Sequence, residues 1–251
     1  MKTIGILMAA GRGTRMNPLT NHTPKPLAKV NTSNNASREL QQYDGKTLLE
    51  INLVKLAPLV DEFVIVIYYL GQQIIDFIGT EFAGKAVRYV WARGYATGTL
   101  DAFRTGIYES DTGDNVNYLV SNSDNFCGPD YYLQLANFLA NSPDKAALMA
   151  TQIQDREILK KVGVFVTDNQ SNFVKVVEKS PVFVSDLANV GIYYFPSKIK
   201  GFISVKIASL NCKEETITDL LNDYASKYPI QILTSKDYNI EISTVLDLQI
   251  N

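Results

Sequence analysis

The stretch LMAAGRGTRMNPLTNHTPKPL, residues 7–27, joins the end of an apolar run to a glycine-containing turn and a proline-flanked lysine. Ala9, Ala10, Gly11 and Gly13 are small enough for backbone N–H groups to approach a ligand closely. A buried strand that leads into such a turn is typical of a cradle for a phosphate or a base. We therefore expect a nucleotide- or phosphate-binding turn directly after the first strand.

Two cations are held near this turn. Arg15 lies within the loop, and Lys25 lies between Pro24 and Pro26, whose fixed φ angles restrict the backbone that carries the ammonium group. Fixed positive groups of this kind pair with phosphate oxygens. The segment thus predicts binding of a small anionic ligand.

Other ligand-binding motifs fail on spacing. A dinucleotide fingerprint G-x-G-x-x-G would need glycine where Met16 stands, which argues against a nicotinamide-dependent oxidoreductase. A Walker A loop ending at residues 45–47 would need glycine where Leu40 stands. The chain has no G-x-S-x-G elbow, and a single histidine, His22, cannot build the zinc motifs that need two. We expect His22 to lie in a surface loop.

Short apolar runs alternate with amphipathic segments of helical length through the first 140 residues, which predicts β–α units around a largely parallel sheet. The expected strands are 4–8, 63–68, 86–91 and 117–122, and the expected helices are 48–56, 72–78, 99–109 and 131–140. After residue 145 strands predominate, at 148–153, 162–167, 173–178 and 189–195. A late helix over 216–228, with Thr216 or Thr218 as its N-cap, precedes strands at 230–233 and 238–242. This second half is expected to add antiparallel strands and a second wall to a cleft.

The segment NTSNNASRELQQYDGK, residues 31–46, is rich in Asn, Ser and Gln and has few large apolar residues. This composition predicts a long polar loop. It is either a solvated insertion or a flap over the ligand site.

Composition narrows the class of protein. With 251 residues and 46% hydrophobic content the chain can bury a full core, and a net charge of -2 gives no basic footprint for nucleic acid. The N-terminal apolar run is too short for a secretory signal or a membrane span, so that we expect a cytoplasmic protein without a membrane partner. Two cysteines, Cys127 and Cys212, are expected to stay free thiols in that compartment.

The ordered string G-x-G-T-R-M-x-P-L-T followed by P-K-P-L resembles the signature of the sugar-phosphate nucleotidyltransferases, the nucleoside-diphosphate-sugar pyrophosphorylases, such as glucose-1-phosphate thymidylyltransferases. Weaker likeness follows in GYATGTLDAF (94–103) and NYLVSNSDNF (117–126). The segments VGVFV, VVEKS and NVGIYYF, within residues 162–195, resemble the sugar-site segments of that family. The resemblance covers almost the whole chain.

This resemblance implies a Rossmann-like, three-layer α/β fold with a mixed, mostly parallel central sheet. It implies a reaction in which an oxygen of a sugar 1-phosphate attacks the α-phosphorus of a nucleoside triphosphate, and pyrophosphate leaves. We expect a single nucleotidyltransferase domain over residues 1–251, with a nucleotide-binding part at 1–140, a sugar-phosphate-binding part at 141–251 and no C-terminal β-helix domain.

The resemblance also implies roles for single residues. Arg15 and Lys25 would be catalytic, by holding the triphosphate and neutralising its charge, and Asp124 and Glu241 would hold Mg²⁺. The implied nucleotide-binding residues are Ala9, Ala10, Gly11, Gly13, Thr14, Arg93 and Gly98. The implied sugar-phosphate-binding residues are Gly163, Glu178, Lys179 and Asn189.

Two positions depart from the pattern of the family, which commonly has glutamine near Arg93 and aspartate where Glu241 stands. The nucleobase and the second metal ligand therefore stay open. The expected ligands are a nucleoside triphosphate and a sugar 1-phosphate, with no nucleic acid, and a homo-oligomer is left open. Two alternatives remain: transfer to a phosphorylated alcohol such as phosphocholine, and a non-catalytic sensor of nucleotides or nucleotide sugars.

Overall fold

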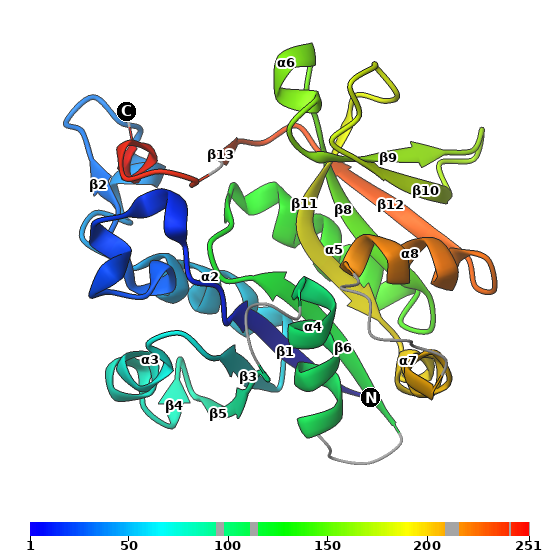
Figure 1. Ribbon diagram of the computed structural model, residues 1–251, viewed down its shortest axis with the longest axis horizontal. Helices are drawn as coiled ribbons and strands as arrows, with labels where there is room; N and C mark the ends of the chain where they lie inside the picture. Colours follow the sequence, from blue (N-terminus) through cyan, green and yellow to red (C-terminus); the bar gives the residue numbers. More distant parts are fainter. Residues whose placement is uncertain (94–97, 111–114, 209–215, 241, 251) are drawn as a thin grey trace.

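In the computed structural model, which describes residues 1–93, 98–110, 115–208, 216–240 and 242–250, ten strands form one mixed β-sheet (Figure 1). Its parallel half consists of β5 (Lys85–Trp91), β3 (Glu62–Ile67), β1 (Lys2–Ala9) and β6 (Val116–Asn122), in this spatial order. The short β4 (Glu81–Phe82) pairs antiparallel with β5. Helices cover both faces of this half, which explains the continuous apolar runs of β1, β3 and β6.

The second half of the sheet is organised around β11 (Leu187–Phe195), which runs antiparallel to β6. On its other edge β11 pairs antiparallel with β8 (Ala146–Gln152), and β12 (Ile230–Ser235) lies parallel to β8. An antiparallel pair of β9 (Gly163–Thr167) and β10 (Phe173–Glu178) joins the beginning of β11. The expected antiparallel strands after residue 145 are confirmed.

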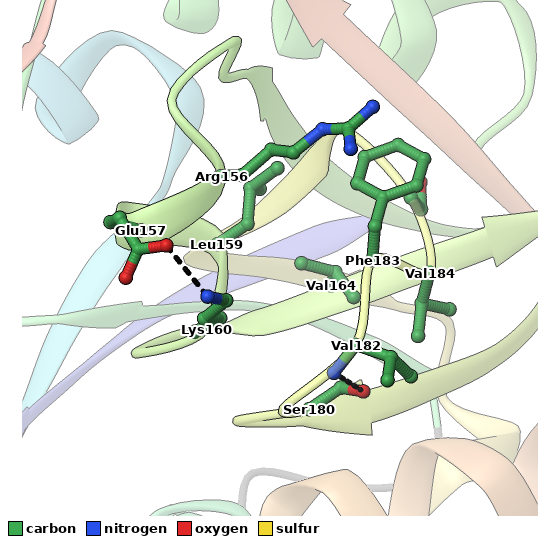
Figure 2. Close-up of a pocket in the computed structure, with 10 residues that line it drawn as sticks. Arg156, Glu157, Leu159, Lys160, Val164, Ser180, Val182, Phe183 and Val184 are labelled. Carbon is green, nitrogen blue, oxygen red and sulfur yellow. Dashed lines mark hydrogen bonds and ion pairs between the residues drawn. The ribbon is translucent and has the colours of Figure 1, made fainter.

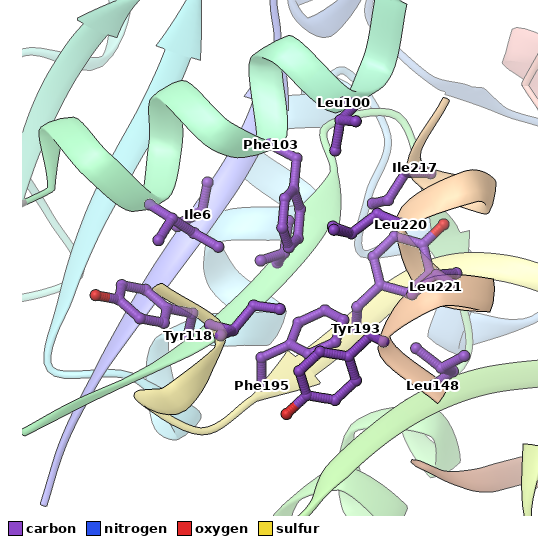
Figure 3. Packing of buried hydrophobic residues seen from close by; sticks show 14 of the residues in the cluster. Ile6, Leu100, Phe103, Tyr118, Leu148, Tyr193, Phe195, Ile217, Leu220 and Leu221 are labelled. Carbon is purple, nitrogen blue, oxygen red and sulfur yellow. The ribbon is translucent and has the colours of Figure 1, made fainter. Parts of the chain in front are cut away.

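Helices form a layer on each face of the sheet. One layer holds α4 (Gly98–Glu109), α7 (Lys198–Ala208) and α8 (Ile217–Ala225), and the other holds α2 (Leu48–Leu56), α3 (Gly71–Ile78) and α5 (Pro129–Asn141). Strand alternation assigns Ile4 and Ile6 of β1 to the first core and Leu7 to the second. Figure 3 shows the first core, in which the ring of Phe103 lies between β1 and α8. The expected three-layer α/β fold is confirmed.

Two segments differ from expectation. Helix α7 was not predicted, because its sequence contains Gly201 and several β-branched residues that do not favour a helix. The helix forms because Ile199 and Ile203, one turn apart, are buried in the first core. The polar segment 31–46 is not simply a loop. It contains β2 (Asn31–Thr32) and α1 (Arg38–Gln41), and β2 pairs with β14 (Gln249–Ile250) beside the C-terminus (Figure 1).

Three simpler expectations concern single residues and membrane spans. Cys127 is a buried free thiol, whereas Cys212 lies outside the described residues. His22 is exposed in a loop, as expected. Within the described part of the chain, no helix combines the length and the apolar character needed to cross a bilayer.

Candidate active site

Two adjoining hollows lie at the edge of the sheet where β1 and β6 end. The first, of about 550 Å³, is lined by the turn that follows β1 and is called the β1 hollow. The second, of about 580 Å³, is lined by the ends of β9 and β10 and is called the β10 hollow. They adjoin because the same residues line both: Arg15, Lys25, Thr99, Asn122 and Asp124.

The turn after β1 forms the floor of the β1 hollow, which is lined by Ala9, Ala10, Gly11 and Gly13. Gly13 has a φ angle of 65°, in the left-handed region that favours glycine. A Cβ atom at this position would lie 2.9 Å from Cβ of Lys25. The glycine therefore serves the close approach of the two segments that carry the small residues and the lysine.

Lys25 and Asp124 meet in this cleft although 99 positions separate them. Strands β1 and β6 are parallel neighbours, with Met8 opposite Asn122, so that the segments after both strands emerge at one edge. Lys25 Nζ lies 2.5 Å from Asp124 Oδ2. The lysine side chain is 13% exposed and the aspartate side chain 32%. The structure thus places an ammonium group and a carboxylate side by side, next to the turn.

Arg15 is positioned by a loop near the C-terminus that sequence reasoning missed. Its Nη1 donates a hydrogen bond to Ser243 Oγ over 3.1 Å. Asp247 closes that loop, because its Oδ2 accepts from the backbone N–H groups of Ser243 (2.9 Å) and Thr244 (2.6 Å). Burial opposes ionisation of Asp247, but these hydrogen bonds and the charge of Lys25 outweigh it and lower its pKa. The signal in the sequence is Ser-Thr followed three residues later by aspartate, a pattern typical of a capped turn.

Gly163 and Glu178 face each other across the β9–β10 pair and line the β10 hollow. A Cβ atom at Gly163 would lie 2.6 Å from Glu178 Oε1, so that a glycine leaves room for the carboxylate. The same oxygen accepts a hydrogen bond from Thr218 Oγ1 over 2.7 Å. Of the two threonines expected to cap α8, Thr216 is the cap, and Thr218 instead binds Glu178.

Asn189 also lines the β10 hollow, on β11. Its Nδ2 donates to the hydroxyl of Tyr193 over 2.9 Å, and its Oδ1 accepts from the N–H of Gly191 over 2.8 Å. The amide is therefore fixed at the wall of the hollow. Glu178 and Asn189 together give this hollow hydrogen-bonding groups suited to hydroxyls.

Some of the remaining predicted site residues lie outside these two hollows. Arg93 lines a separate hollow of about 460 Å³ with Trp91 and Asp101, and its N–H donates to Asp101 Oδ2 over 3.3 Å. Thr14 begins a short 3₁₀ helix and Lys179 is exposed just after β10; neither lines the β1 or the β10 hollow as far as the structure describes them. Gly98 begins α4. Glu241 lies outside the described residues.

A smaller pocket of about 180 Å³ lies outside this cleft, between α6 (Arg156–Leu159) and the segment 180–185 (Figure 2). The guanidinium group of Arg156 lies 4.9 Å from the ring centroid of Phe183. Helix α6 separates the two spaces, because Ile158 lines the β10 hollow and Leu159 lines this pocket. The predicted site residues within the described ranges do not line it.

The carboxylate of Asp124 is the group in the cleft best suited to a divalent cation. It is a hard oxygen ligand that lines both hollows. In the parts of the chain that the structure describes, no three His, Cys, Asp or Glu side chains gather into a metal-binding group. Mg²⁺ commonly takes one or two protein carboxylates and completes its shell with phosphate and water, so that the residues present fit such an ion.

The chain is thus a mixed α/β protein with a cleft at the edge where parallel strands end, the place where open α/β sheets bind ligands. The chain belongs to the nucleotidyl transferase family, whose sequence model matches residues 4–238.

Two relatives with longer chains are similar in sequence to most of this chain. The bifunctional protein GlmU of Methanocaldococcus jannaschii is 26% identical over 244 residues, which are 97% of this chain and 52% of that protein. The catalytic subunit beta of mannose-1-phosphate guanylyltransferase of Drosophila melanogaster is 26% identical over 217 residues, 83% of this chain and 52% of that protein. The chain thus spans about half the length of these relatives.

Solved structures share the fold. A UDP-glucose pyrophosphorylase complexed with UDP-glucose superposes with a TM-score of 0.78 at 19% identity, covering 99% of this chain and 96% of that one. UDP-glucose pyrophosphorylase from Acinetobacter baumanii superposes with a TM-score of 0.78 at 16% identity, and the match covers 99% of this chain and 91% of that one. At these identities the likeness extends to the fold alone.

Proposed function

We propose that the protein transfers a nucleoside monophosphate from a nucleoside triphosphate to a sugar 1-phosphate, giving a nucleoside-diphosphate sugar and pyrophosphate. The observation that carries this function is the convergence of Arg15, Lys25 and Asp124 where the β1 and β10 hollows adjoin. The names of relatives such as mannose-1-phosphate guanylyltransferase support the same chemistry. A cytoplasmic location for the reaction is part of this proposal.

The β1 hollow is the proposed triphosphate site, formed mainly by residues of the 1–140 part. Backbone groups of the turn at Gly11 and Gly13 approach the nucleotide, while Arg15 and Lys25 neutralise phosphate oxygens. Transfer at phosphorus depends mainly on in-line positioning and charge stabilisation, so that no protein nucleophile is needed. Lys25 pairs with Asp124 in the structure, and its ammonium group would pair with phosphate oxygens once the triphosphate is bound.

Mg²⁺ is the proposed metal, held by Asp124, and when bound it supplies positive charge to the phosphate oxygens. Glu241 stays a prediction for a second ligand. The base-facing role of Arg93 also stays a prediction, since this residue lines a separate hollow beside α4.

The β10 hollow is the proposed sugar-phosphate site, formed mainly by residues of the 141–251 part. Glu178, held by Thr218, and Asn189, held by Tyr193, offer polar atoms to sugar hydroxyls. A quaternary ammonium such as choline is typically recognised by an aromatic cage. The described residues that line this hollow include no aromatic side chain, which favours a sugar over phosphocholine. Lys179 is exposed beside this hollow, and we propose that its side chain turns towards the phosphate of the sugar when the sugar 1-phosphate binds.

A panel of pyrophosphate-release assays tests the proposal. The full chain is incubated with Mg²⁺, each of the common nucleoside triphosphates, and either a set of sugar 1-phosphates or phosphocholine. Release should occur with at least one sugar 1-phosphate and should disappear in Asp124→Asn, whereas the exposed Asp76→Asn should keep full activity. Turnover with phosphocholine alone would replace the sugar by an alcohol, and ligand binding without any turnover would identify a sensor.

A further inference from the structure

Asn52 is a polar residue on the buried face of α2. Its side chain is completely buried, at 0% exposure, and its helical neighbours Leu49 and Leu53 pack into the core beneath the sheet. Burial of an amide is costly unless its polar atoms find partners. An asparagine at this position therefore requires a compensating contact.

That contact is with the loop that carries Asp124. Asn52 Nδ2 donates to the carbonyl oxygens of Asn125 (2.8 Å) and Ser123 (3.3 Å), the residues on either side of Asp124, and to Leu48 (2.9 Å) within its own helix. Asn52 Oδ1 has no hydrogen-bond partner among the described residues. The amide is thus placed as a donor to the backbone on both sides of one carboxylate.

The other attachments of this loop come from the sheet. Ser123 Oγ donates to the carbonyl of Met8 at the end of β1 over 2.9 Å, and Asn125 Nδ2 donates to Ser121 Oγ on β6 over 3.1 Å. Within the described ranges, Asn52 attaches this loop to the helical layer. The backbone is therefore held from the interior, while the Asp124 side chain lines the cleft and reaches Lys25.

We propose that Asn52 is a positioning residue for the metal-binding carboxylate. By holding the two carbonyl groups that flank Asp124, it fixes the direction in which the carboxylate meets a divalent cation and the ammonium group of Lys25. This role rests on the proposed function, because it takes Asp124 as a metal ligand. Asn52 itself lines neither the β1 nor the β10 hollow as described, so that it acts through the backbone of the Asp124 loop.

Binding of Mn²⁺ alone, followed by electron paramagnetic resonance of the full-length protein, tests this role. Asn52→Leu keeps a similar volume but removes both N–H donors, and we expect the dissociation constant for Mn²⁺ to rise by about 10-fold to 100-fold, the range typical of groups that orient metal ligands. Leu53→Ala is the matched control, because Leu53 is as buried on the same helix and its apolar side chain cannot hydrogen-bond to the loop. Its Mn²⁺ affinity should stay within about twofold of the native value.

The outcomes separate the two hypotheses. Native Mn²⁺ affinity in folded Asn52→Leu, or an equal loss in Leu53→Ala, would overturn the positioning role while leaving Asp124 as a ligand. Mn²⁺ binding that does not change in Asp124→Asn would overturn the metal assignment and the role of Asn52 with it. If Asn52→Leu does not fold, Asn52→Ala replaces it, because the smaller side chain relieves the packing and still removes both N–H donors; unchanged affinity there also refutes the role.

Discussion

Replacement of Lys25 by methionine is the sharpest single change to the cleft, because it keeps most of the side-chain stem and removes the charge. Nζ of Lys25 lies 2.5 Å from Asp124 Oδ2 and lines both hollows. If this ammonium group neutralises phosphate charge during transfer, kcat should fall by two to three orders of magnitude. That estimate corresponds to about 2.7–4 kcal/mol, the usual effect of removing one preorganised group that stabilises developing charge.

The expected cost in stability is much smaller. The Lys25–Asp124 pair is partly exposed, with side-chain exposures of 13% and 32%, so that its loss should lower the free energy of unfolding by about 1 kcal/mol. A domain of ordinary stability, about 5–15 kcal/mol, would stay folded. Loss of turnover in Lys25→Met could therefore not be explained by unfolding.

The assay is steady-state release of pyrophosphate, with urea unfolding measured on the same samples. Lys29→Met is the matched control, because Lys29 is an exposed lysine of the same segment that does not line either hollow as described. The control should retain native kcat. A kcat within about threefold of wild type in folded Lys25→Met would refute the proposed role, since it corresponds to less than ~1 kcal/mol.

Two further changes probe the sugar site and a buried charge. Thr218→Val removes the hydroxyl that donates to Glu178 over 2.7 Å. This variant should raise KM for the sugar 1-phosphate by about fivefold or more, while KM for the triphosphate stays unchanged. Equal changes in both KM values would contradict the assignment of Glu178 to the sugar site. Burial lowers the pKa of Lys55 from 10.5 to about 8, although the charges of Glu39 and Asp237 oppose the shift. Between pH 8 and 10.5 the Lys55 amine is therefore more protonated in the unfolded chain than in the folded one. The free energy of unfolding of the wild type should then rise by up to ~3 kcal/mol over this pH range relative to that of Lys55→Met. If urea unfolding gives the same pH dependence for both proteins, the lowered pKa is contradicted.

Most of the parallel half could be predicted because its signals are local. The predicted helix 48–56 coincides with α2, whose start is capped by Thr47 and Glu50 and which precedes Pro58. Buried strands such as β1 and β6 leave continuous apolar runs in the sequence. Since parallel strands end at one edge, the convergence of Lys25 and Asp124 followed from topology as well as from motif.

The rest depends on contacts between segments distant in sequence. The pairing of β2 with β14 could not be seen in residues 31–46, because the partner strand lies near the C-terminus. The contact of Thr218 with Glu178 depends on the docking of α8 beside β10, and that of Asn52 with the Asp124 loop depends on the docking of α2 against the segment that follows β6. Arg93, which was chosen by resemblance, lines a separate hollow, and its role as a base-facing residue stays a prediction.

The fate of the α-phosphate tests the central claim most directly. A triphosphate labelled at the α-phosphorus is incubated with the protein, Mg²⁺ and a sugar 1-phosphate, and the products are separated and counted. The label should appear in a nucleoside-diphosphate sugar, with one pyrophosphate released for each molecule formed. Label that stays in the triphosphate across the whole panel, or that appears only in free nucleoside monophosphate, would contradict transfer to a sugar.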